Sequence, residues 1–217
     1  MKVEIQDFII EYDKEISYLN DLVYILENNT KDILDFFELD KISNKKKVVI
    51  YNDIEKYKEH LKPYVKEYDD WMCADTFDGN INLLDIEIAR QTESHKYMTL
   101  EELLKVALHE FVHSCQQEIG FCPEGNEWYW ETLSTNLSGQ EFTEINLKDF
   151  DFKEFRENFN INNKEKSSRH YSASYMIGKY MLENYSKDKI LEYIKYPNKL
   201  IEDTENIFEE VKNIKIK

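Results

Sequence analysis

The stretch from Val106 to His113 reads His-Glu-x-x-His inside an apolar run, and it constrains the fold more than any other part of the chain. Residues four apart on an α-helix lie nearly in line on one face. His109 and His113 can therefore present ring nitrogens to one ion. Glu110 is rotated by about 100° from His109, which places its carboxylate beside the ion rather than on it. Two ligands and a nearby carboxylate base are what a zinc hydrolase needs.

The residues around this motif predict a helix. Thr99-Leu100-Glu101-Glu102 has the pattern of a capping box, with Thr99 as the N-cap. Gly120 suits the position just past the helix end. Apolar residues recur at helical spacing between these ends, at Leu103, Leu104, Ala107, Leu108, Phe111, Val112 and Cys115. The alternative, a chance match with two core histidines, is disfavoured by this helical context.

A catalytic zinc site needs a third protein ligand. Downstream, Trp128-x-x-Glu131 is followed by Leu137-Ser138-Gly139-Gln140. This pattern after a His-Glu-x-x-His helix resembles the gluzincins, the thermolysin-like clan of zinc peptidases. The resemblance makes Glu131, eighteen positions beyond His113, the third zinc ligand. Glu127 is the rival, one helical turn earlier on the same face. The resemblance favours Glu131.

The same resemblance suggests a residue that stabilises the oxyanion. A run from His170 to Met181 opens a helix, and related gluzincins carry a similar tyrosine run at this point. By position Tyr171 is the first choice and His170 the second. A phenol is suitable because it donates a hydrogen bond to developing negative charge and stays neutral at working pH.

The order of predicted elements suggests an α+β fold. We expect helix over Tyr12–Leu39 with a break at Asn28–Thr30, and a strand over Lys45–Tyr51. Further predicted elements are a helix over Asp53–Tyr68, a strand over Trp71–Ala74, a hairpin at Asp78-Gly79, a strand over Asn80–Leu84 and two helices around Pro197.

The resemblance implies a thermolysin-like fold in a single domain, 1–217. Residues 1–98 would form an α/β upper subdomain with a small mixed sheet, and 99–217 would form the metal-binding helices and a mainly helical lower subdomain. It also implies that Asn80–Leu84 is the sheet edge over the cleft, where a peptide or protein substrate adds as a further strand.

Charge and cysteine content indicate which classes of partner and which cellular compartment to expect. The net charge of −16 argues against nucleic acid or an anionic membrane as a partner. The N-terminus lacks a signal-peptide pattern, and no apolar run is long enough for a membrane span. The chain has an odd number of cysteines, Cys73, Cys115 and Cys122, without metal-type spacing, which fits a reducing compartment. We therefore expect a cytoplasmic location.

These features predict a zinc-dependent metallopeptidase. His109, His113 and Glu131 would bind Zn²⁺, Glu110 would act as general base, and Tyr171 or His170 would donate to the oxyanion. No motif for binding a free N-terminus is found, which favours an endopeptidase over an aminopeptidase. The alternatives are a non-catalytic scaffold protein that retains the gluzincin fold, and a zinc amidohydrolase that acts on a non-peptide substrate.

Overall fold

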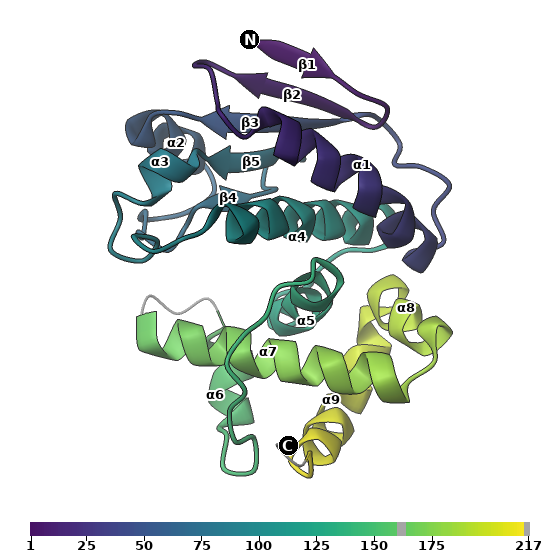
Figure 1. Cartoon of the computed structure of the whole chain (residues 1–217). Helices are drawn as coiled ribbons and strands as arrows, with labels where there is room; N and C mark the ends of the chain where they lie inside the picture. The colour runs from purple at the N-terminus through teal and green to yellow at the C-terminus, as the bar shows by residue number, and fades with distance from the viewer. Residues whose placement is uncertain (160–163, 215–217) are drawn as a thin grey trace. The chain divides into compact units, whose positions relative to one another are not determined.

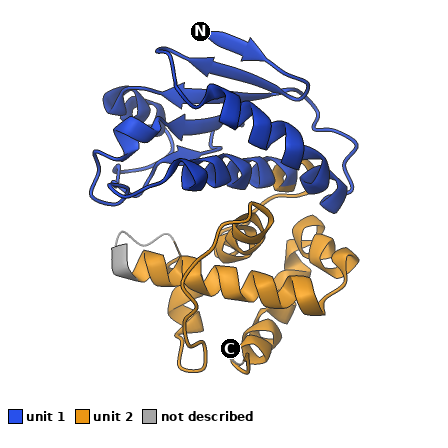
Figure 2. Cartoon of the chain, in the orientation of Figure 1, with its two compact units in different colours: residues 1–115 blue, residues 116–217 orange. Residues whose placement is uncertain are grey.

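The computed structural model describes residues 1–159 and 164–214 (Figure 1). The chain forms two compact units, Met1–Cys115 (unit 1) and Gln116–Lys217 (unit 2), which Figure 2 colours separately. Unit 1 combines strands and helices, and the described part of unit 2 is helical, so the α+β class is confirmed. The boundary lies inside the histidine helix, whereas the sequence placed it earlier, between residues 98 and 99.

Unit 1 is built around a small mixed sheet. Its strands are β1 (Lys2–Glu4), β2 (Phe8–Tyr12), β3 (Lys46–Tyr51), β4 (Ala74–Asp75) and β5 (Ile81–Leu84). Its helices are α1 (Leu19–Phe36), α2 (Ile54–Leu61), α3 (Ile86–Ala89) and most of α4 (Leu100–Ile119).

The strand order is β1-β2-β3-β5-β4, with β2, β3 and β5 parallel and the two outer strands antiparallel to their neighbours. The prediction that Asn80–Leu84 forms the sheet edge is therefore wrong, because β5 pairs on both sides. The turn at Asp78-Gly79, where Gly79 has φ +79°, folds β4 along the outer side of β5. The predicted hairpin is confirmed, and β4 is the edge strand that it creates.

The two faces of the sheet pack against different helices. Ile10, Val48 and Ile81 are paired across three strands and are buried. On the same face, the Phe8 ring meets Phe111 of α4 edge-on, with ring centroids 5.1 Å apart. On the opposite face, the ring of Tyr51 contacts α2. The sheet thus has α4 on one face and α2 on the other.

Several predictions for unit 1 differ from the structure. The helix expected from Tyr12 begins at Leu19, and the strand expected over Trp71–Ala74 is Ala74–Asp75. Helix α1 runs unbroken through Asn28–Thr30, because these three side chains bond to carbonyl groups four residues earlier and follow the helix instead of interrupting it. Helix α2 ends at Leu61 rather than Tyr68, just before Pro63, which cannot continue a helix. Strands β1 and β2 were not predicted.

The described helices of unit 2 are α5 (Glu127–Leu137), α6 (Phe152–Glu157), α7 (Lys164–Asn184), α8 (Lys187–Lys195) and α9 (Pro197–Val211). The last two confirm the prediction of two helices around Pro197. Helix α7 begins before His170, where the sequence expected the helix to open.

Helices α5 and α7 approach each other closely. A Cβ atom on Gly178 of α7 would lie 2.3 Å from the Thr132 carbonyl oxygen and 2.2 Å from Asn136 Nδ2, so only glycine fits. Asn136 Nδ2 donates to the Tyr175 carbonyl oxygen at 3.0 Å. Asn136 therefore joins the two helices.

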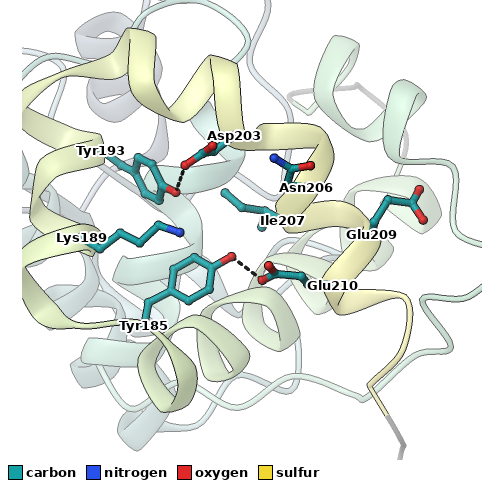
Figure 3. Close-up of a pocket in the computed structure, with 8 residues that line it drawn as sticks. All are labelled: Tyr185, Lys189, Tyr193, Asp203, Asn206, Ile207, Glu209 and Glu210. Carbon is teal, nitrogen blue, oxygen red and sulfur yellow. Dashed lines mark hydrogen bonds between the residues drawn. The ribbon is translucent and has the colours of Figure 1, made fainter.

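The core of unit 2 is aromatic. Trp128 is fully buried and its ring contacts Phe155 and Phe208. Near the end of the chain, α8 and α9 line a polar pocket of about 320 Å³ (Figure 3). Its tyrosines donate to carboxylates on α9, Tyr185 to Glu210 at 2.5 Å and Tyr193 to Asp203 at 2.6 Å. These hydrogen bonds fasten α9 to the preceding helices.

None of the helices described is both long enough and apolar enough to cross a bilayer.

Candidate metal centre

Helix α4 carries the two histidines, and its start matches the predicted capping box. The Glu102 amide donates to Thr99 Oγ1 at 3.2 Å, and the Thr99 amide donates to the Glu102 carboxylate at 2.6 Å. At the other end, a Cβ atom on Gly120 would lie 2.3 Å from the Ile194 carbonyl oxygen. Gly120 is therefore needed for a close backbone approach as well as for ending the helix.

His109 and His113 present their Nε2 atoms to each other at a distance of 3.0 Å. Their rings are nearly perpendicular, with centroids 4.7 Å apart. Two nitrogens bound to one tetrahedral zinc ion at 2.0–2.1 Å would be roughly 3.4 Å apart. The pair therefore needs to open by only a few tenths of an ångström to hold an ion.

Glu110 is 8% exposed and lies near two other polar groups of unit 1. Burial, and to a lesser extent the Glu110 carboxylate, raises the pKa of the Cys73 thiol to about 12. Burial, together with Asp75, Cys73 and Glu110, raises the pKa of the Tyr57 phenol well above its ordinary value. Cys73 therefore stays a protonated thiol at neutral pH and is unsuited to act as a nucleophile.

Helix α5 carries Glu131, and the last turn of α4 holds this helix. Buried Gln116 Nε2 donates to the Trp130 carbonyl oxygen at 3.0 Å, one residue before Glu131. Two hydroxyl groups of α5 form hydrogen bonds within the helix. Thr132 Oγ1 donates to the Trp128 carbonyl at 2.7 Å and Ser134 Oγ to the Trp130 carbonyl at 2.9 Å. Both hydroxyls are therefore satisfied without disturbing the helix.

One ligand atom from each of His109, His113 and Glu131 lies within 4.8 Å of the other two. Two imidazole nitrogens and a carboxylate oxygen are a donor set that zinc binds in catalytic sites, and the spacing fits bonds of about 2 Å to one ion. The residues present therefore fit the metal. Glu127 is in no such group among the described residues.

The two candidates for the oxyanion have different surroundings. His170 is 2% exposed, with Nδ1 3.1 Å from the Phe159 carbonyl oxygen and Nε2 2.9 Å from the Glu154 carboxylate. Both of its nitrogens are thus engaged within unit 2. The Tyr171 ring stacks on Phe142 at 5.8 Å and is only partly buried. Tyr171 is therefore less buried than His170.

A second group of possible metal ligands was missed by the sequence reasoning. Single ligand atoms of His60, Asp75 and Asp78 also lie within 4.8 Å of one another. They come from α2, β4 and the β4–β5 turn. No short motif joins them, because His60 lies fifteen residues before Asp75. The only sequence signal was the Asp78-Gly79 hairpin, which brings part of the group together.

No protein-family model matches this sequence, and a comparison with curated proteins finds no match. The function must therefore be inferred from the side chains and their geometry.

Proposed function

We propose that the protein is a zinc-dependent metallopeptidase of thermolysin-like type. The observation that carries the proposal is the convergence of His109, His113 and Glu131, whose ligand atoms lie within 4.8 Å of one another. Two of these residues flank an acid in a His-Glu-x-x-His helix, so that a carboxylate lies one residue from the first ligand. This combination serves hydrolysis better than structural metal binding, which normally uses four protein ligands.

When bound, zinc would supply an activated water and polarise the carbonyl group of the substrate. Glu110 would accept the proton of the attacking water and then donate it to the leaving amine. Its burial suits this task, because a site that excludes bulk water strengthens local electrostatic interactions and limits side reactions. Glu110 is 8% exposed.

Tyr171 would donate a hydrogen bond to the oxyanion. His170 serves instead to join α7 to α6, through its contact with Glu154 of α6. Burial opposes the ionisation of Glu154, but its hydrogen bonds to His170 and Lys166 outweigh this effect and lower its pKa. The pair therefore stabilises unit 2.

A substrate peptide that adds to the sheet would pair with β4, the edge strand, and not with β5. Since β4 comprises only Ala74 and Asp75, such pairing would be short. We therefore expect most of the cleavage specificity to come from side-chain contacts.

Metal content and cleavage activity of three proteins test the proposal. Wild type should contain at least one zinc per chain and cleave members of a peptide library. Glu110→Gln should keep the zinc and lose at least about 100-fold in rate, because proton transfer typically contributes 10²–10⁴-fold. Glu101→Gln is the matched control, since Glu101 is exposed on the same helix and should leave both quantities unchanged.

Unchanged cleavage by Glu110→Gln would refute its role as base. A wild type that binds no zinc even after the ion is added would favour the non-catalytic scaffold. A zinc-loaded wild type that cleaves no peptide but hydrolyses other amides would favour the amidohydrolase.

A further inference from the structure

The group formed by His60, Asp75 and Asp78, here called the hairpin cluster, lies wholly within unit 1 and shares no residue with the candidate zinc site. His60 Nε2 is 3.0 Å from Asp75 Oδ1 and 3.2 Å from Oδ2. The Asp75 side chain is 2% exposed and that of His60 is 10% exposed, whereas Asp78 is exposed. The cluster thus has a buried base and an open side, through which an ion can enter.

The donors suit a divalent transition-metal ion. An imidazole nitrogen and two carboxylate oxygens within 4.8 Å of one another match bonds of about 2.0–2.4 Å to a shared ion. Mixed nitrogen and oxygen ligands of this kind suit Zn²⁺ and Mn²⁺ better than Ca²⁺, which takes oxygen ligands alone. Asp78 remains ionised, because hydrogen bonds from Asn82 and Asn80 outweigh the effect of burial and lower its pKa.

A fourth side chain points into the cluster and is incompletely bonded. Asn82 is 0% exposed, and its Nδ2 donates to Asp75 Oδ1 at 3.1 Å and to Asp78 Oδ1 at 2.9 Å. Among the described residues nothing donates a hydrogen bond to its Oδ1. Two carboxylates impose this orientation, since they would repel the amide oxygen. A cation among them reverses that preference, and rotation of the amide then offers Oδ1 as a ligand.

We propose that the hairpin cluster is a second metal site, which binds a divalent transition-metal ion through His60, Asp75 and Asp78, with Asn82 Oδ1 as a further ligand. The three ligands come from the last turn of α2, from the edge strand β4 and from the β4–β5 turn. A bound ion therefore links these segments and stabilises the edge of the sheet. This second site does not depend on the proposed peptidase activity.

Metal titration of a variant that lacks the first site tests the proposal. His109→Ala/His113→Ala protein, freed of metal with a chelator, is titrated separately with Mn²⁺ and Zn²⁺. One ion of either kind should bind per chain and raise the melting temperature. Adding Asp78→Asn should weaken binding at least about tenfold, because it removes a charged ligand at the open side of the site. Asp32→Asn, an exposed acid on α1, is the matched control and should bind normally.

Far-UV circular dichroism establishes that each variant is folded. If the double-histidine variant does not fold, Glu131→Ala provides the same test with the first site weakened. Absence of Mn²⁺ and Zn²⁺ binding in a folded variant would overturn the proposal and leave His60 and Asp75 as a hydrogen-bonded pair. Binding that Asp78→Asn does not alter would place the ion elsewhere. Neither result would affect the wild-type zinc site, so the two proposals fail separately.

Discussion

The candidate zinc site and the hairpin cluster each bring three ligand atoms within 4.8 Å of one another, yet they are built differently. In the zinc site, His109 and His113 lie one turn apart on a single helix, and only Glu131 comes from another element. In the hairpin cluster every ligand comes from a different segment. The first site is therefore largely preformed by a helix, whereas the second exists only once the sheet has folded.

The hairpin cluster is hydrogen-bonded in the absence of an ion. The carboxylates of the hairpin cluster already accept hydrogen bonds from His60, Asn82 and the Phe77 amide. A metal must displace part of this network, which lowers its net affinity. The candidate zinc site offers two imidazole nitrogens, whereas the hairpin cluster offers one, and imidazole is a favoured ligand of Zn²⁺. We therefore expect the zinc site to bind its ion more tightly than the hairpin cluster.

The largest expected effect distinguishes the two glutamates of α5. Glu131→Ala should weaken zinc binding by at least about 100-fold, because it removes a direct ligand, whereas loss of an outer partner typically costs 10–100-fold. Glu127→Ala, the matched control on the same helix, should leave the affinity unchanged. Competition with a chromophoric chelator measures both. The reverse result would exchange the roles of the two residues.

The next effect tests how α5 is held in place for ligation. Gly178→Ala should destabilise unit 2 by roughly 2–4 kcal/mol, since the new methyl group would overlap α5 and force the helices apart. Chemical denaturation measures the loss. Ala173→Ser, a similar small change at another buried position of α7, provides a comparison. Equal stability of Gly178→Ala and wild type would show that the two helices are not in close contact.

The hairpin cluster should contribute to stability even without metal. In chelator-treated protein, Asp75→Asn should cost about 1–3 kcal/mol, because a buried network loses its charged acceptor. His113→Ala under the same conditions is the comparison, and it should cost less if the histidine pair serves to bind an ion rather than to stabilise the fold. If His113→Ala lost more stability than Asp75→Asn, the histidine pair would be the site that stabilises the metal-free fold, contrary to the expectation.

The start of the histidine helix should have a smaller effect. Thr99→Ala removes one hydrogen bond of the capping box and should cost about 1 kcal/mol. Thr99→Ser keeps the hydroxyl group and should restore most of the stability. Thermal unfolding at neutral pH measures both. A loss that serine does not rescue would assign the effect to the threonine methyl group and not to the cap.

The smallest effect concerns the other histidine–carboxylate pair, His170 and Glu154. Since the pKa of Glu154 is lowered in the folded protein, its contribution is present above its unfolded pKa and is lost as pH falls through the folded value. Stability should therefore decline below about pH 4.5. Glu154→Gln should make this decline smaller, by less than about 1 kcal/mol. Glu157→Gln, at an exposed neighbouring position, should leave the decline unchanged. Identical stability–pH profiles of Glu154→Gln and wild type would rule out a contribution of Glu154 to this decline.

Local patterns predicted those parts of the fold whose hydrogen bonds are local. The capping box at Thr99, the hairpin at Asp78-Gly79 and the helices around Pro197 each occur where the sequence placed them. Errors arose where local signals compete. The sequence predicted a helix break at Asn28–Thr30, but these side chains donate hydrogen bonds to backbone carbonyl groups of the same helix. Strands β1 and β2 are held by pairing with β3 and with each other, which no local pattern reports.

The sequence by itself determined the histidine pair, because residues four apart on a helix must face the same way. It also selected Glu131 over Glu127, through a resemblance and not through geometry. Only the tertiary structure decided that β5 is internal and that β4 forms the edge, since strand order depends on which elements pack together. The tertiary structure also decided that the hairpin cluster forms, because His60 and Asp75 meet only when α2 covers the sheet. Contacts between distant residues arise from packing, which short patterns do not encode.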